Sequence, residues 1–146
     1  MRADDAAGLL AAQALASLLD RSQTLQQLAV EIFLGETAPE NLTGPIKAFQ
    51  PTHLVVLDAL DTGGEPGHIC LLHPDEIAAS ATASTHNASL TLLTDYLRRF
   101  LDFKILLIGI QPQTLEFGKP PSTPVRKAAR NLAREMASTM TRQAIR

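Results

Sequence analysis

The chain has 146 residues, of which 45% are hydrophobic and 19% charged, and its formal net charge is -2. This length suits a single domain with a buried core, and the slightly acidic balance gives no electrostatic footprint for nucleic acid or an anionic membrane. The only cysteine, Cys70, lies in an apolar run; the absence of an internal disulfide, a signal-peptide pattern and any apolar run near about 18 residues favours a cytoplasmic protein without a transmembrane helix.

The first third of the chain predicts a helix, a strand and a short helical segment. Asp4 or Asp5 can cap a helix whose apolar residues recur at the spacing of one buried face as far as Leu19, with an end near residues 20–22. Residues 28–34, ended by glycine, predict a strand. Pro39 suits the first position of a helix, so a brief helical segment is expected to about residue 45.

The next apolar run predicts a buried strand that ends in an acid. Residues 54–57 are four consecutive aliphatics, which is typical of a parallel strand covered on both faces. Ligands of open α/β sheets bind outside the carboxyl ends of the strands, so Asp58 is placed where a functional side chain would point into a cleft. The structural alternative is that Asp58 only caps the following turn.

The middle of the chain predicts a second strand, a loop and a helix. Residues 68–72 follow a short glycine-rich turn, so they are expected to pair antiparallel with the preceding strand. Cys70 lies in this strand and is interpreted as a small core residue. Residues 78–84 are small and weakly patterned, which suggests a mobile loop that delivers His86 ahead of a helix beginning near Ser89.

The last part of the chain completes an α/β pattern. Residues 104–110 are a second continuous apolar strand, and Pro124 opens a final helix with a regular buried stripe. Its basic residues are interpreted as a solvated face: Arg126, Lys127, Arg130 and Arg134. These elements predict a three-layer αβα sandwich with a mostly parallel, twisted sheet in one domain over residues 1–146. A doubly wound domain normally begins with a strand, whereas this chain begins with a helix.

Three polar residues form a possible metal site. The chain has none of the glycine-rich phosphate loops, zinc motifs or nucleophile elbows. Asp5 at a helix start, Asp58 at a strand end and His86 before a helix can converge at one edge of the sheet. Two carboxylates and an imidazole suit nickel or zinc. In the alternative reading Asp5 is only a cap and His86 a polar loop residue, and His53, His68 and His73 are structural.

Several short segments resemble the nickel-iron hydrogenase maturation endopeptidases, in particular those that process the large subunit of the formate-hydrogenlyase hydrogenase (hydrogenase 3). The segments run in the family's order over nearly the whole chain, and together they are specific. They are Asp4-Asp5-Ala6-Ala7-Gly8, Thr37-Ala38-Pro39-Glu40-Asn41, Val56-Leu57-Asp58-Ala59-Leu60-Asp61, Pro66-Gly67, Thr85-His86-Asn87 and Gly109-Ile110-Gln111-Pro112.

The resemblance implies a phosphorylase/hydrolase-like fold with a mostly parallel five-stranded sheet. It also implies an aspartic-type protease that removes a C-terminal extension from the hydrogenase large-subunit precursor after nickel insertion. The family's metal-contacting and catalytic positions fall on Asp5, Asp58 and His86, and Asp61 matches a second acid that can assist. Nickel is expected to arrive bound to the substrate, with other divalent metals able to substitute.

The chain departs from the family pattern at its start. The family begins with a strand and a Gly-Asn turn, which have no counterpart here, and Ala3 and Ala6 stand where the family has glycine. We expect the start to be assigned too late or the chain to be a truncation. A polypeptide that begins at Met1 is expected to be poorly stable or inactive, because neighbouring strand edges lose about 1 kcal/mol for each missing ladder bond, besides the lost burial.

Two functions from different classes follow from these observations. The first is the precursor-processing endopeptidase, a monomer that binds neither nucleic acid nor membrane. The alternative is a non-catalytic maturation factor that binds the precursor or nickel without cutting. A nucleotide-binding module is disfavoured because its phosphate loop is absent.

Overall fold

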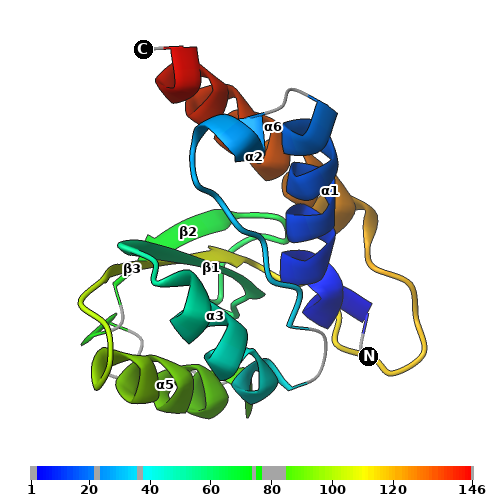
Figure 1. Cartoon of the computed structure of the whole chain (residues 1–146). Helices are drawn as coiled ribbons and strands as arrows, with labels where there is room; N and C mark the ends of the chain where they lie inside the picture. The colour runs from blue at the N-terminus through cyan, green and yellow to red at the C-terminus, as the bar shows by residue number, and fades with distance from the viewer. Residues whose placement is uncertain (1–2, 22–23, 36–37, 74, 77–84, 146) are drawn as a thin grey trace.

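The computed structural model describes residues 3–21, 24–35, 38–73, 75–76 and 85–145. These residues form a three-stranded sheet with helices on both faces (Figure 1). In chain order the elements are the 3₁₀ turn η1 (Ala3–Ala6), α1 (Ala7–Arg21), α2 (Thr24–Gln27), the 3₁₀ turn η2 (Pro39–Leu42), α3 (Thr43–Phe49), β1 (His53–Ala59), β2 (Ile69–Leu72), α5 (Thr85–Arg98), β3 (Lys104–Ile110) and α6 (Thr123–Ile145).

The strand β3 lies at the centre of the sheet, whose order is β1-β3-β2. β1 runs parallel to β3 along its whole length, and Leu57 lies opposite Ile108. β2 runs antiparallel to β3, and Leu71 also lies opposite Ile108. The central position explains why β3 is a continuous aliphatic run, since both of its faces are covered.

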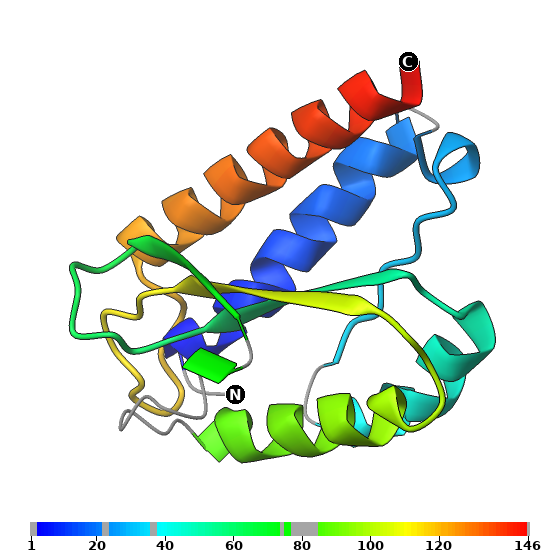
Figure 2. The same cartoon turned by 90° about the vertical axis from the view of Figure 1, so that its left-hand side faces the viewer.

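Helices cover both faces of the sheet, with α1 and α6 on one side and α3 and α5 on the other (Figure 2). The core under α1 and α6 contains Ala7, Ala11, Ala59, Ile108, Ile110, Val125, Ala128, Ala129 and Leu132. The core under α3 and α5 contains Ile46, Leu60, Leu90, Leu93, Leu97 and Leu107. The predicted three-layer αβα sandwich is therefore confirmed, with one parallel and one antiparallel strand pairing.

Most elements predicted from hydrophobic periodicity are present. The first helix, the short helical segment after Pro39, both continuous apolar strands and the final helix lie where they are expected. Cys70 is half-buried and packs against the core under α3 and α5, as expected for a small core residue. The basic residues of α6 are exposed. No described helix combines the length and apolar composition needed to cross a membrane.

Two strand predictions are wrong. Residues 28–34 form a turn and then extended chain from residue 30, and none of their backbone groups has a ladder partner among the described residues. Val30, Ile32 and Phe33 are partly buried, as they would be in a strand, but a groove separates this segment from β1. The described sheet consequently has three strands rather than the five that the family resemblance implies.

The second wrong prediction concerns the partner of β2, which pairs with β3 and not with its predecessor β1. The connection between β1 and β2 crosses the carboxyl end of β3 and is held there by backbone hydrogen bonds. Leu60 N–H donates to Ile110 O, Gly67 N–H donates to Gln111 O, and Gln111 N–H donates to His68 O. The short connection therefore passes over one strand instead of forming a hairpin. The predicted loop at residues 78–84 lies outside the described residues.

A glycine allows α1 to touch β1. A Cβ atom at Gly8 would lie 2.0 Å from Leu57 O and 2.8 Å from Asp58 Cα, so any side chain there would push helix and strand apart. Because Asp5 lies one turn before Gly8, this close approach also sets the position of Asp5 relative to the end of β1.

Replacing Gly8 by alanine should destabilise the fold by about 3 kcal/mol, because the added methyl group has no space beside the β1 backbone. Urea unfolding followed by circular dichroism measures the change. The matched control is Gly44→Ala in α3, where a Cβ atom meets nothing within 4 Å. That variant should be neutral or more stable by up to about 1 kcal/mol. Equal effects of the two substitutions would contradict the close-approach argument.

Candidate active site

Asp58 is the last but one residue of β1, at the carboxyl edge of the sheet as predicted, and it is half-buried. Its Oδ1 accepts a hydrogen bond from Ala59 N–H at 2.8 Å. This bond joins the carboxylate to the next amide of its own strand. Asp58 also lines a groove beside β1. Its functional role and its role as a turn cap both stay predictions.

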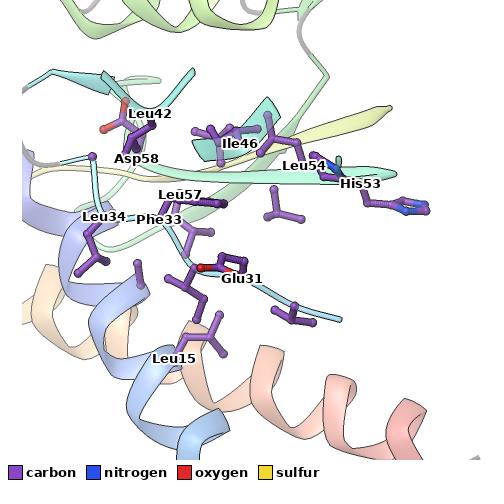
Figure 3. A pocket seen from close by; sticks show the side chains of 18 of the residues that line it. Leu15, Glu31, Phe33, Leu34, Leu42, Ile46, His53, Leu54, Leu57 and Asp58 are labelled. Carbon is purple, nitrogen blue, oxygen red and sulfur yellow. The ribbon is translucent and has the colours of Figure 1, made fainter. Parts of the chain in front are cut away.

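The groove, called here the β1 groove, lies between β1 and the extended segment 29–35 and has a volume of about 480 Å³ (Figure 3). Asp5 and Asp58 both line it, so η1 and β1 bring the two predicted carboxylates to the same cavity. His53 lies at the opposite end of β1 from Asp58. Most of the lining is aliphatic or aromatic and includes Leu15, Val30, Ile32, Phe33, Leu42, Ile46, Leu54, Val56, Leu57, Leu90 and Leu93.

His86 lies in the first turn of α5, which begins at Thr85. The prediction that it belongs to a loop before the helix is wrong, because the helix begins earlier than its apolar periodicity indicates. Its side chain is outside the described residues. The start of α5, the turn η1 and the end of β1 lie at the same edge of the sheet (Figure 2). The backbone therefore places the third predicted residue on the same side as Asp5 and Asp58.

Asp5, Asp58 and His86 together would suit a borderline divalent metal, since carboxylate oxygens and imidazole nitrogen are both ligands of such ions. Among the side chains that the structure describes, no cluster of three His, Cys, Asp or Glu residues could hold a metal, and His86 is not one of those side chains. No described serine or cysteine is hydrogen-bonded to a histidine. The described side chains of this edge therefore show no hydroxyl or thiol nucleophile paired with a histidine base.

Asp61, the second acid after β1, holds the turn that follows the strand. Its Oδ1 accepts hydrogen bonds from Gln111 Nε2 and from Gly63 N–H, each at 3.0 Å. The Gln111 side chain first, and then the Gly63 amide, lower the pKa of Asp61 below its usual value of 3.8. Gln111 also accepts hydrogen bonds from Thr62 N–H and Gly64 N–H through Oε1. Asp61 does not line the β1 groove, so its role here is to shape the turn.

Asp4 is a structural residue that sequence reasoning missed, because the helix-start pattern marked it only as a possible cap. Its side chain is 0% exposed and binds the segment before α6 instead of its own helix. Oδ2 accepts from Gln113 N–H at 2.7 Å and Thr114 N–H at 3.1 Å, and Oδ1 accepts from Ser122 N–H at 2.7 Å. Ser122 Oγ donates a further bond at 2.8 Å. These bonds tie η1, and hence Asp5, to the start of α6.

The pKa of Asp4 follows from this environment. Burial by itself raises the pKa of a carboxyl group. The backbone hydrogen bonds from Ser122, Thr114 and Gln113, together with the Ser122 hydroxyl, outweigh burial and hold the pKa of Asp4 below 3.8. The charged carboxylate is consequently the form that stabilises the fold.

Comparisons with known proteins support one family. The sequence model of the family described as HycI, hydrogenase maturation protease, matches residues 14–139. The hydrogenase 3 maturation protease of Escherichia coli K12 is 37% identical over 94 residues, which are 64% of this chain and 60% of that relative. The match therefore spans less than two thirds of that curated relative.

Solved structures of similar proteins share the fold. A [NiFe] hydrogenase maturation protease HycI from Thermococcus kodakarensis superposes with a TM-score of 0.78 and 30% identity, over 95% of this chain and 85% of that chain. The endopeptidase HycI from Escherichia coli gives a TM-score of 0.74 and 30% identity, over 94% and 83% of the two chains.

The Asp4 network predicts a stability change that depends on pH. Asp4→Asn places an amide group opposite backbone donors and should cost about 2 kcal/mol at pH 7. Because the folded-state pKa is below the unfolded value, the stabilisation is present above pH 3.8 and is lost as the pH falls through the lowered value. The difference between wild type and Asp4→Asn should therefore narrow below pH 3.8, as measured by thermal melts from pH 7 downwards.

The exposed Asp20 at the end of α1 provides the control. Asp20→Asn should leave the melting temperature within about 2 °C of wild type across this range. A difference between wild type and Asp4→Asn that stays constant with pH would show that packing, and not the charge of Asp4, stabilises the fold.

Proposed function

This chain belongs to the hydrogenase maturation protease family, and we propose that it is an endopeptidase acting on the precursor of a nickel-iron hydrogenase large subunit. It removes the C-terminal extension of that precursor after nickel has been inserted. The observation that supports this proposal is the convergence of Asp5, Asp58 and the start of α5 at one edge of the sheet. We also propose that it acts as a cytoplasmic monomer.

In the proposed mechanism, nickel belongs to the substrate and arrives on the precursor. The carboxylates of Asp5 and Asp58 and the imidazole of His86 complete its coordination, which brings the scissile peptide bond to the mouth of the β1 groove. Cleavage then depends on the metal, so precursors without nickel are not cut. Other divalent ions with similar ligand preferences should substitute when they occupy the same position on the precursor.

Two routes of hydrolysis fit the proposed aspartic-type chemistry. Nickel polarises the scissile carbonyl in one route and activates a water molecule in the other, and a carboxylate of this chain accepts a proton in both. An acyl-enzyme route is disfavoured, since no described serine or cysteine has a histidine partner. Gly8 and the Asp4 network support both routes by holding Asp5 against the end of β1.

Replacing Asp58 or His86 should slow cleavage strongly. Asp58→Asn and His86→Ala are each expected to slow release of the C-terminal extension at least about 100-fold, because each removes a ligand or a base while leaving the core intact. Mass spectrometry of a nickel-loaded large-subunit precursor measures the release. Variants are compared after circular dichroism has shown that each is folded.

Residues of the same type at the opposite edge of the sheet serve as controls. Asp102 precedes β3 and is exposed, and His53 begins β1 and is exposed. Asp102→Asn and His53→Ala should cleave at rates close to wild type. Unchanged cleavage by folded Asp58→Asn and His86→Ala would refute the metal-recognition site. Precursor binding by the wild-type chain without any mass loss would instead support the non-catalytic maturation factor.

Nickel dependence is tested on the substrate. A precursor prepared without nickel should remain at full mass after incubation with the wild-type chain, and addition of nickel to that precursor should restore cleavage. Preincubating the protease alone with a chelator, followed by removal of the chelator, should have no effect because the metal belongs to the substrate. Cleavage of the nickel-free precursor at the rate of the loaded one would exclude this part of the mechanism.

A further inference from the structure

The loop between β3 and α6, residues 113–121, carries an exposed aromatic side chain. Phe117 is 83% exposed, which is the largest exposed fraction among the large hydrophobic side chains that the structure describes. Leu115 of the same loop is also exposed. Single exposed apolar residues are common on protein surfaces, so exposure by itself assigns no role to Phe117. The way in which the loop is held, and the place where it lies, distinguish it from an ordinary surface loop.

The backbone of the loop 113–121 is held at both ends by Asp4. Its carboxylate accepts hydrogen bonds from Gln113 and Thr114 N–H at one end and from Ser122 N–H at the other. The path of the loop is therefore fixed before any partner binds. A partner that contacts Phe117 has to order little more than the side chain itself, which keeps the entropic cost of binding low.

A glycine turn and an ion pair shape the tip of the loop. Gly118 has a φ of +79°, a left-handed conformation that favours glycine, and it forms a turn directly after Phe117. Glu116 and Lys119, on either side of the turn, form an exposed salt bridge. They are the only charged residues of the loop 113–121, so its tip has no net charge. An apolar partner surface therefore fits this tip better than a strongly charged one does.

The loop lies beside the candidate active site. Ala3 N–H donates a hydrogen bond to Glu116 O at 3.4 Å, which places the loop next to η1 (Figure 2). Asp5, which lines the β1 groove, also belongs to η1. Consecutive Cα atoms lie about 3.8 Å apart, so this short path keeps the Cα atoms of Asp5 and Phe117 within about 20 Å of one another. An extended peptide covers that distance in about six residues.

We propose that Phe117 is a substrate-docking residue, which contacts an apolar side chain of the large-subunit precursor within about six residues of the cleaved bond. This inference rests on the proposed function, since it places the scissile bond at Asp5 and Asp58. A precursor bound there continues as chain on both sides of that bond, and this chain passes the edge of the sheet that carries the loop 113–121. The uncharged tip of the loop selects apolar side chains of the precursor.

Docking at Phe117 contributes to affinity and not to the chemical step. The ring lies away from the carboxylates that act on the peptide bond, so its contact with the precursor is the same before and during cleavage. An interaction that is equally strong in the ground state and in the transition state lowers KM and leaves kcat unchanged.

Cleavage kinetics of the nickel-loaded precursor separate docking from chemistry. Phe117→Ser should raise KM about tenfold and leave kcat within about twofold of wild type, because it removes uniform binding. Phe117→Leu keeps an apolar side chain and should hold KM within about threefold of wild type. Both variants should keep the melting temperature within about 2 °C of wild type, since the replaced ring is exposed.

Phe100 provides the matched control. It is 55% exposed and lies between α5 and β3, at the opposite edge of the sheet from the candidate site. Phe100→Ser should cleave the precursor with KM and kcat close to those of wild type. An equal rise of KM in Phe117→Ser and Phe100→Ser would overturn the proposal, because a general loss of surface hydrophobicity would then account for both.

A photo-reactive side chain locates the contact. Phe117 is replaced by p-benzoylphenylalanine, and after irradiation with the nickel-loaded precursor the cross-linked peptide is sequenced by mass spectrometry. The cross-link should map to an apolar residue within about six positions of the cleaved bond. The same photo-reactive residue in place of Phe100 should give no cross-link. A cross-link from position 117 only to distant parts of the precursor would overturn the proposed place of docking.

The outcomes separate this inference from the proposed activity. If the wild-type chain cleaves the precursor and Phe117→Ser has an unchanged KM, or a lowered kcat alone, the docking role is overturned and the protease activity stands. If the wild-type chain binds the precursor without cutting it, the Kd replaces KM in the same comparison. Absence of both binding and cleavage would overturn both proposals.

Sedimentation tests a second copy of the chain as the alternative partner of Phe117. The wild-type chain and Phe117→Ser should sediment alike. A wild-type dimer that Phe117→Ser dissociates, with no change in KM, would identify a second copy of this chain as the partner and would overturn docking of the precursor.

Discussion

The close contact between α1 and β1 is the constraint on which the rest of the structure depends. Gly8 lets the helix backbone approach Leu57 O to a distance that no side chain would permit. This contact places the start of α1 at the carboxyl edge of the sheet, with Asp5 beside the end of β1. A helix displaced by even one methyl group would move the two carboxylates apart and alter the wall of the β1 groove.

Asp4 fixes the same region from the other side. Its buried carboxylate accepts hydrogen bonds from three backbone amides and one hydroxyl of the segment between β3 and α6. The first residues of the chain are thereby bound to the loop that follows the central strand and to the beginning of the longest helix. Gln111 holds the turn after β1 in the same way, because its Oε1 accepts hydrogen bonds from two backbone amides of that turn. The candidate site is thus held by hydrogen-bonded loops that meet at one edge of the sheet.

The β1 groove and the candidate site share this edge. Asp5 and Asp58 line the groove together with aliphatic side chains of β1, so the two candidate carboxylates border an apolar cavity.

Local sequence determined much of this protein by itself. The periodicity of α1 and α6, the aliphatic runs of β1 and β3, and the positions of Asp5 and Asp58 follow from patterns within single segments. Tertiary structure decided that β2 pairs with β3 and that residues 30–34 form no strand. It also decided that Asp4 binds the segment before α6 instead of capping its own helix. The physical reason is that strand pairing and carboxylate hydrogen bonds join residues far apart in the chain, such as Asp4 and Ser122, whereas periodicity records only which side of one element is buried.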